Sequence, residues 1–471
     1  MKRVLCFLLV LIVLGTSLVA ITGVALVKES DNVTFTVIDE WGDRRNLQDV
    51  TADMEFTHNG KLNWSVEFSP LGETKTEYDY KTIVTDKGEV YRYYGISNAS
   101  YNLLDLKNDN RQLKTDIESL KSEVMKDGDI RTMKIRMKDY FQYYPVNFDF
   151  SVDEMSVSWR TALGYDDVGS YSFSGISYSR GNRFLQAMRD FLKIPVHEDD
   201  IREIRIHKDA YGNYSYGGAY SGSFDFDFYN AVFSDMLYFT FRNEITKHEQ
   251  DEEKRVVDTS LIPGGYGIYA LPLTENDVKY EEMKTVYSIP ATSTVRALLK
   301  DEERNELYLA LHENGKYILH VIDISTMTDI SVIELFDFHE DGYVHVNQYE
   351  DFFVFIKNSV DFNVVKRNDD GKYESALTGA MPPETVADRD YFSGNSRFAF
   401  DGERLIVFVL EDPGYEEICI LSIQPDVMVF TKDGLQYYCK WLCSLGEPVS
   451  RWRPHFVYKQ SDSVRINNTE K

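Results

Sequence analysis

Carboxylates and aromatic rings alternate in the segment SFDFDFY. If this segment is a strand, Asp225 and Asp227 share one face, because successive side chains point to opposite sides. Phe224, Phe226 and Phe228 then lie on the other face. Two carboxylates on one face could ligate a cation or a sugar, but a strand with one solvated face has the same pattern. We expect the solvated strand.

A second aromatic group, in the segment DYFQYYPV, is a candidate ligand-binding face for a glycan or a peptide. Its members are Tyr140, Phe141, Tyr143 and Tyr144. Aromatic side chains also fill cores at strand ends, where they bury large apolar areas. Core packing is therefore the alternative, and the plainer one.

Motifs that specify a reaction are missing from the sequence. It contains no G-x-S-x-G, no H-E-x-x-H, no P-loop, no dinucleotide fingerprint and no EF-hand loop. His312, His320 and His345 fall in strand-like text, where we expect structural histidines rather than metal ligands. We predict no catalytic residue, no metal and no cofactor.

The cysteines give a weak signal. Cys419, Cys439 and Cys443 follow Cys6, which lies in the apolar N-terminal run. Residues four apart on one strand are too distant for a disulfide. We expect buried free thiols, with a cross-strand bridge from Cys419 as the alternative.

The charge balance excludes one class of partner. The chain of 471 residues has 51 basic and 77 acidic residues, a net charge of −26. Such a field repels phosphate backbones. We therefore expect no nucleic-acid binding.

The N-terminus predicts membrane attachment. After a stub of residues 1–3, residues 4–27 contain no charged side chain. As a helix this run would measure about 36 Å, enough to cross a hydrocarbon core of about 30 Å. Lys2 and Arg3 favour a cytoplasmic N-terminus. We expect a single-pass cell-membrane protein with an extracytoplasmic C-terminal part; a cleaved signal peptide is the alternative.

Heptad spacing marks residues 96–127 as an amphipathic helix. Apolar side chains and one asparagine occupy the a and d positions of the repeat: Leu103, Leu106, Asn110, Leu113, Ile117, Leu120 and Val124. Lysines follow at e and acidic residues at g. Over this short stretch the sequence resembles a parallel dimeric leucine zipper, in which a single asparagine at a sets the register.

Two interpretations of this helix remain open. The resemblance implies a homodimer of tethered chains, and the same apolar stripe would also pack on a neighbouring sheet of its own chain. The segment has about three heptads, which is short for an independent coiled coil because helix nucleation is costly.

The rest of the chain predicts β-structure. Residues 28–95 contain two segments with hairpin signals, around Asn59-Gly60 and Lys87-Gly88. A short helix is expected near 182–194, where apolar residues recur at helical spacing. The remainder of 128–471 is rich in alternating or fully apolar strand-like runs.

Residues 292–338, 342–383 and 395–443 could each supply about four short antiparallel strands. Turn signals separate the runs, at Asn314-Gly315, Asp341-Gly342, Asp370-Gly371, Asp401-Gly402 and Asp433-Gly434. This organisation resembles the blades of a β-propeller, whose units measure roughly 40–50 residues. We therefore expect a mainly β, propeller-like domain, with two packed β-sandwiches as the alternative.

The combined expectation is a membrane-tethered, non-catalytic binding or scaffold protein whose ligand is an envelope protein, a peptide or a glycan. One alternative is an extracytoplasmic carbohydrate-active hydrolase or lyase built on a propeller. A second alternative is a structural envelope component that dimerises through the helix.

Overall fold

The computed structural model describes residues 12–18, 21, 33–58, 62–80, 90–102, 110–158, 170–177, 183–217, 223–225, 227–248, 251–273, 278–337, 343–381, 396–411, 422–445 and 456–466. The chain forms two compact units. Unit 1 contains residues 1–89, 157–171 and 341–471, and unit 2 contains residues 90–156 and 172–340.

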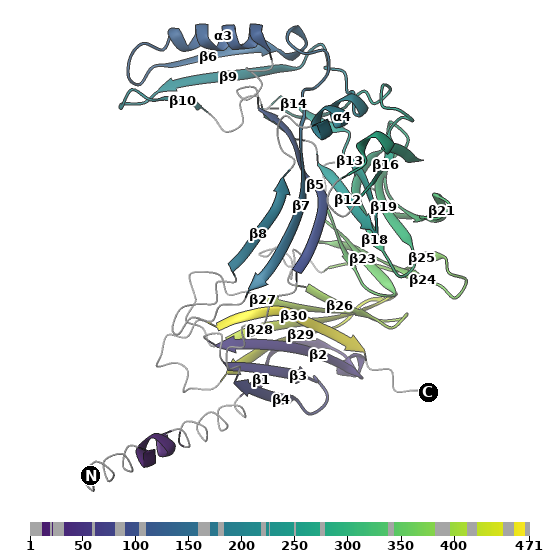
Figure 1. The fold of residues 1–471 in the computed structure, drawn as a ribbon. Coiled ribbons are helices and arrows are strands. Elements are labelled where there is room, and N and C mark those ends of the chain that lie inside the picture. The colour runs from purple at the N-terminus through teal and green to yellow at the C-terminus, as the bar shows by residue number, and fades with distance from the viewer. Residues whose placement is uncertain are drawn as a thin grey trace, which may run out of the picture. The chain divides into compact units, whose positions relative to one another are not determined.

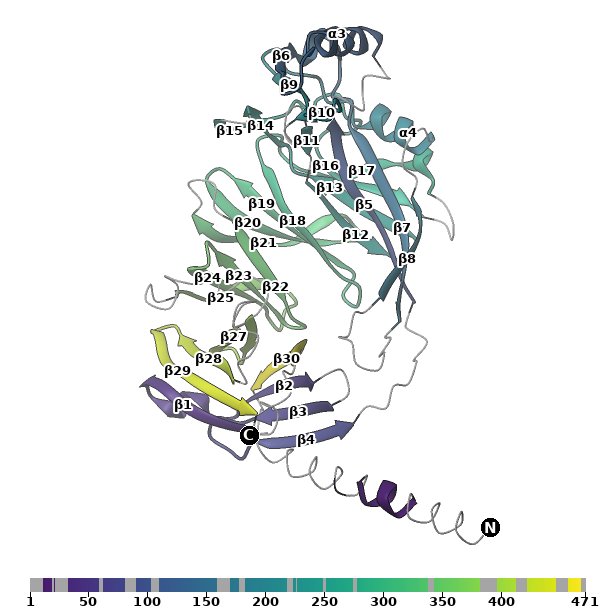
Figure 2. The same cartoon turned by 90° about the vertical axis from the view of Figure 1, so that its left-hand side faces the viewer.

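The described residues of unit 1 form three antiparallel sheets, of which Figure 2 shows the first and the third near the C-terminus. The first has the order β30 (Phe456–Ile466), β2 (Val50–His58), β3 (Leu62–Phe68) and β4 (Lys75–Tyr80). The second has the order β22 (Val344–Gln348), β23 (Phe352–Lys357), β24 (Asp361–Arg367) and β25 (Tyr373–Ala380). The third has the order β1 (Val33–Gly42), β29 (Gly434–Leu445), β28 (Ser422–Thr431), β27 (Leu405–Glu411) and β26 (Ser396–Phe400).

In unit 1, strands from the two ends of the chain pair with one another. The early strand β1 pairs with β29, with Val33 opposite Leu445. The last strand β30 pairs with β2, with Val50 opposite Ile466. Each of these two sheets is therefore completed by a strand from the opposite end of the sequence, which ties residues 33–80 to residues 396–466.

The described residues of unit 2 include three four-stranded antiparallel sheets. One has the order β11 (Ser223–Asp225), β5 (Val90–Asn102), β7 (Asn147–Ser158) and β8 (Ser170–Ser177). Another has the order β12 (Phe228–Phe233), β13 (Met236–Phe241), β16 (Gly267–Pro272) and β17 (Lys284–Ser288). The last has the order β18 (Thr294–Asp301), β19 (Glu306–Glu313), β20 (Lys316–Asp323) and β21 (Thr328–Asp337).

The blade expectation is confirmed at the level of the sheets. Residues 292–338 form β18–β21, residues 342–383 form β22–β25, and residues 395–443 supply β26–β29. Glycines of four predicted turns, Gly315, Gly371, Gly402 and Gly434, have positive φ, a conformation that glycine adopts without strain. The chain is mainly β and propeller-like in the form of its sheets.

Central strands explain why these sheets form. In β23, Phe353, Val354, Phe355 and Ile356 are all buried, so both faces of the strand are covered. A strand covered on both sides has a continuous apolar sequence, and the apolar runs noted above are these strands. Burial of such side chains is the main force that stabilises the sheets.

Of the two hairpins predicted in residues 28–95, the structure describes the strands of one. The first hairpin is confirmed, because β2 pairs with β3 in register from Ala52–Phe68 to His58–Leu62. The second stays a prediction, because most of its first arm, residues 81–86, lies outside the described residues; β5, which contains the second arm, pairs with β7 and β11. The Lys87-Gly88 turn itself lies outside the described residues.

The described residues of unit 2 include two short α-helices. Helix α4 (Arg183–Phe191) confirms the helix expected near 182–194. Helix α3 is shorter than the predicted 96–127, since it contains only Arg111–Ser122. Residues 96–102 belong instead to β5.

Most of the expected anchor, residues 4–27, lies outside the described residues. Residues 12–18 are helical, and the large apolar side chains of Ile12, Leu14 and Leu18 are exposed. Within the described part of the chain, no helix is both long and apolar enough to cross a bilayer.

Candidate functional site

Unit 2 includes a small group of elements that belongs to none of the blade-like sheets. Helix α3 lies on a three-stranded sheet with the order β10 (Tyr214–Gly217), β9 (Ile201–Lys208) and β6 (Ile130–Arg136). Figure 1 shows α3 along one face of β6 and β9. We call these four elements the helix–sheet module. Two insertions build it, one between β5 and β7 and one between β8 and β11.

The apolar stripe of α3 is the core of this module. Leu113, Ile117, Leu120 and Val124 are buried, and they pack in one cluster with Ile135, Ile204 and Ile206 of the sheet. The helix-packing alternative therefore describes where these side chains lie. A dimer seam would need the same surface, which is covered within the chain in this conformation. Leu103 and Leu106 lie outside the described residues.

Asn110 differs from the heptad prediction. It precedes the helix as its N-cap, and its Oδ1 accepts a hydrogen bond of 3.0 Å from the Leu113 N–H. Its Nδ2 donates to the Tyr140 carbonyl oxygen at 2.7 Å. The asparagine thus satisfies one free amide at the start of the helix and attaches that end to the chain after β6. It is not an interior a position.

The aromatic group of residues 140–144 is part of the same packing. Tyr140 and Phe141 are half-buried against the core cluster, and Tyr144 is buried within it. The Tyr140 hydroxyl donates to Asp116 Oδ2 at 2.7 Å. Burial and the Asp116 carboxylate raise the pKa of Tyr140 to about 12. Tyr143 forms an isolated bridge with Pro195. These contacts favour core packing over an open ligand face.

Asp200 and Arg202 form a buried ion pair that contacts Tyr144. The Asp200 and Arg202 side chains are 2% and 5% exposed, and Arg202 Nε is 2.7 Å from Asp200 Oδ1. The Tyr144 hydroxyl donates to Asp200 Oδ2 at 2.7 Å. Arg202 Nη2 also donates to Asp200 Oδ2 at 3.2 Å, and this charge pairing offsets part of the cost of burying both groups. It fixes the start of β9 against residue 144.

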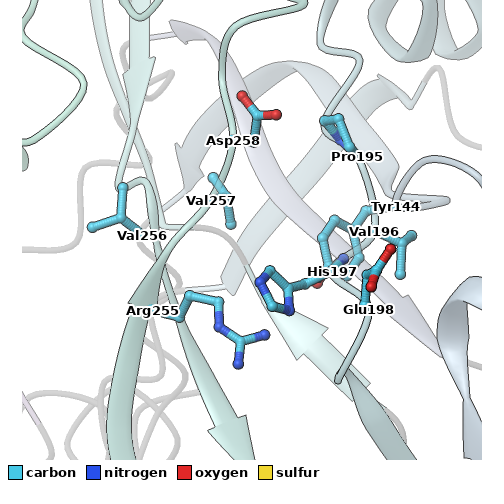
Figure 3. A pocket seen from close by; sticks show the side chains of 9 residues that line it. All are labelled: Tyr144, Pro195, Val196, His197, Glu198, Arg255, Val256, Val257 and Asp258. Atoms are coloured by element: carbon cyan, nitrogen blue, oxygen red, sulfur yellow. The ribbon is translucent and has the colours of Figure 1, made fainter.

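A pocket of about 160 Å³ is lined in part by Tyr144, whose hydroxyl contacts this pair (Figure 3). It lies between the segment that enters β9 and the strand β15 (Asp251–Val256) with the residues that follow it. Its lining residues are Tyr144, Pro195, Val196, His197, Glu198, Arg255, Val256, Val257 and Asp258. The volume suits a few waters or a side-chain-sized group.

Charged groups connect the two sides of the pocket. Asp199 Oδ1 is 2.6 Å from Arg255 Nη1, and Asp199 Oδ2 accepts from Arg255 Nη2 at 2.8 Å. His197 Nδ1 also contacts the Asp199 carboxylate. The Arg255 hydrogen bond, with a smaller contribution from His197, lowers the pKa of Asp199. A bidentate arginine–carboxylate pair of this kind fixes orientation as well as charge.

The pocket carboxylates do not match a glycoside hydrolase. Such an enzyme needs one carboxylic acid with a raised pKa. Hydrogen bonding from Lys138 lowers the pKa of Glu198, and hydrogen bonds from Ser260 lower that of Asp258. Both groups are therefore ionised at neutral pH. Neither has the property of a general acid.

Sequence reasoning missed this pocket. His197 and Asp199 precede Arg255 by more than fifty positions in sequence, and only the fold brings the three together. The run HEDD at residues 197–200 was the one visible signal. Acidic runs are common on solvated surfaces, so this run alone did not predict a pocket.

The segment SFDFDFY is not the single strand that was expected, because β11 ends at Asp225 and β12, in another sheet, begins at Phe228. Asp227 is 3.5 Å from Arg242 Nη1, and the neighbouring Phe228 stacks on Phe241. The side chain of Asp225 lies outside the described set. No group of metal-ligating residues is found in the described part of the chain.

The cysteines and one of the histidines also have structural surroundings. Cys439 and Cys443 are buried free thiols, and burial raises the pKa of Cys443 to about 12. Cys419 lies outside the described residues. His320 Nδ1 is 3.1 Å from the Tyr287 hydroxyl and 3.2 Å from Asp329 Oδ1, as expected of a structural histidine.

The face of the module sheet opposite α3 is exposed. The registers place Ile130, Thr132, Lys134 and Arg136 of β6 on this face, beside Ile201, Glu203, Arg205 and His207 of β9. All four β6 side chains are exposed, as are Ile201 and Arg205. This face combines the isolated apolar residues Ile130 and Ile201 with charged residues, among which arginine is a residue type enriched in protein interfaces.

Comparison with known proteins does not identify the chain. No protein-family model and no curated protein matches it. Solved structures with some similarity include Hsv2p of Kluyveromyces lactis, with 9% identity, 68% of this chain, 99% of that chain and a TM-score of 0.27. A putative 6-phosphogluconolactonase of Bacteroides uniformis has 10% identity, 88% and 100% coverage and a TM-score of 0.27. The WD40 domain of SCAP from fission yeast has 9% identity, 88% and 91% coverage and a TM-score of 0.25. TM-scores this low do not establish a shared fold.

Proposed function

We propose that the chain is a membrane-tethered, extracytoplasmic binding or scaffold protein that holds its partner on the helix–sheet module. The observation that supports this most directly is the exposed face of β6 and β9. Four consecutive outward positions of β6, from Ile130 to Arg136, are exposed, while the opposite face of the same sheet is covered by α3.

The construction of the module supports a role in recognition. Its elements come from two separate insertions between strands of one blade-like sheet, and none of its strands belongs to that sheet. Insertions that are held by a rigid scaffold are common places for binding residues. The buried Asp200–Arg202 pair and the Asn110 cap fix the position of the exposed face.

The N-terminal sequence supports the tether. The uncharged run of residues 4–27 has the length of a membrane span, and the exposed Ile12, Leu14 and Leu18 would be covered by lipid. Extraction of membranes at high pH tests this part. The full chain should remain in the pellet, and a chain without residues 4–27 should be released. Release of the full chain would contradict the tether.

Site-specific photo-cross-linking tests the binding role. A photoreactive amino acid replaces Arg205 on the exposed face, and a matched control replaces the exposed Lys372 in the turn before β25 of unit 1. Cross-linking in the native membrane should give defined adducts from position 205 and none from position 372. Equal patterns from both positions would contradict binding on the module.

The two alternatives have weaker support. Against a carbohydrate-active enzyme, neither Glu198 nor Asp258 in the described pocket has a raised pKa. A dimer through α3 would require the buried Leu113 and Ile117 to lose their packing against the sheet of their own chain.

A further inference from the structure

We infer that the free edge of β6 binds an extended acidic peptide segment of a partner protein as an added antiparallel strand. This inference rests on the proposed function and specifies its partner class. Addition of a strand to an exposed sheet edge is a known mode of peptide recognition, in which main-chain hydrogen bonds supply affinity and side chains supply specificity.

The hydrogen-bond phase of β6 shows which backbone groups are available. The Met137 N–H donates to the Asp200 carbonyl at 2.9 Å, and the Lys208 N–H donates to the Asp129 carbonyl at 3.1 Å. Residues of an antiparallel strand face their partner alternately. The odd-numbered residues 131, 133 and 135 therefore pair with β9, and the even-numbered ones direct their N–H and C=O groups to the other edge.

That other edge has no partner strand in the described part of the chain, because β6 ends the order β10-β9-β6. Arg131 Nη1 donates to the Ile130 carbonyl at 2.9 Å, which occupies one acceptor at the edge. The outward N–H and C=O groups of Thr132, Lys134 and Arg136 follow it. These residues offer a ladder that one short strand could complete.

Charge selects the occupant. Strand β6 contains Arg131, Lys134 and Arg136 and no acidic residue, in a chain with a net charge of −26. Lys134 forms no ion pair among the described residues, and the Arg136–Asp139 pair of 3.3 Å is exposed and therefore weak. Lys134 and Arg136 are among the residues whose N–H and C=O groups point to the free edge. The residues of an added strand directly opposite them would have their side chains on the same face, so acidic side chains there would form cross-strand pairs.

The same charges argue against a second copy of this chain as the occupant. Antiparallel pairing of two β6 strands would bring six cations together, with no acidic residue on either strand. Lysine on an edge strand also protects native proteins from unspecific pairing. This protection and the inferred binding are compatible, because a cationic edge rejects most strands and favours acidic ones.

A labelled peptide of the sequence Glu-Val-Glu-Val-Thr-Val-Val tests the inference. In antiparallel register its two glutamates lie opposite Arg136 and Lys134, and its threonine lies opposite Thr132. Fluorescence anisotropy with the full chain in detergent micelles should show saturable binding. A peptide with lysine at both glutamate positions should bind at least about tenfold more weakly, a loss of about 1.4 kcal/mol.

Two further probes separate strand addition from simple charge attraction. N-methylation of the second glutamate and of the threonine removes N–H groups that would face β6, and it leaves the peptide charge unchanged. On the protein, Thr132→Pro removes an outward N–H and should leave pairing with β9 intact, while Thr132→Ala is the matched control. Circular dichroism and the thermal midpoint check that both variants fold.

The inference predicts loss of binding with the methylated peptide and with Thr132→Pro, and binding within about twofold of the parent with Thr132→Ala. The inference would be overturned if the methylated and parent peptides bound equally well. It would also be overturned if a sulfated polysaccharide bound as well as the peptide when the two compete at equal charge. Failure of the peptide while cross-links from position 205 persist would reject the edge and leave the proposed function standing.

Discussion

Asn110 Oδ1 lies 3.0 Å from the backbone nitrogen of Leu113, the geometry of a helix N-cap. The same side chain donates to the Tyr140 carbonyl oxygen, on the segment that follows β6. One residue therefore sets both where α3 begins and how that end of the helix attaches to its sheet. In the heptad pattern, by contrast, this asparagine would be a register-setting residue between two helices.

Substitution of Asn110 separates these roles. Asn110→Ala removes the cap and should lower the free energy of unfolding by about 1 kcal/mol. Asn110→Asp keeps an acceptor for the Leu113 N–H but loses the donor to Tyr140, so its cost should be smaller. Urea unfolding of the full chain in micelles measures both, with the exposed Thr115→Ala as a control on the same helix. A larger loss for Asn110→Asp than for Asn110→Ala would contradict the cap.

Ile117 tests the packing of the helix on its own sheet. This side chain is fully buried in the cluster with Ile135 and Ile204. Ile117→Ala should reduce the free energy of unfolding by about 2–4 kcal/mol through lost transfer energy and a cavity. Light scattering should give the same oligomeric state for parent and variant, and Glu118→Ala, on the exposed face, should change neither quantity. Dissociation of a parent dimer by Ile117→Ala at unchanged stability would favour the zipper.

The sheets were more predictable than the site, for a physical reason. Runs such as residues 352–357 are apolar at nearly every position, and a strand covered on both faces requires this pattern. The turns between strands need glycine with positive φ, as Gly371 and Gly434 show. Both signals are local in sequence, so a reader of the sequence can find them.

Long-range pairing has no such local signal. The pairing of β1 with β29 places Val33 opposite Leu445, and neither strand's sequence indicates which strand it pairs with. The pocket has the same character, since Arg255 reaches Asp199 only through the fold. The heptad pattern was ambiguous for a different reason. Apolar residues at helical spacing indicate a face that must be covered, and a sheet of the same chain covers it as well as a second helix would.

The buried pair of Asp200 and Arg202 makes an asymmetric prediction. Arg202→Met leaves the Asp200 carboxylate in the core without its cation, which should cost about 3–5 kcal/mol. The double variant Arg202→Met with Asp200→Leu removes both charges and should recover much of that loss. Chemical unfolding of the single and double variants gives the coupling energy. Additive losses would show that the two side chains do not depend on one another.

The Asp199–Arg255 contact predicts a dependence of stability on pH. The pKa of Asp199 is lowered in the folded chain, first by the Arg255 hydrogen bond. A carboxyl group with a depressed folded pKa stabilises the fold above its unfolded pKa of about 4, and this contribution is lost as the pH falls through the folded value. Arg255→Gln should therefore have a lower thermal midpoint than the parent at pH 7. The two midpoints should converge as the pH falls below about 4. Thermal melts of both proteins from pH 7 to pH 3, with the exposed Arg131→Gln as the matched control, measure the difference. A gap that stays constant across this range would show that Arg255 acts through packing, independently of the Asp199 charge.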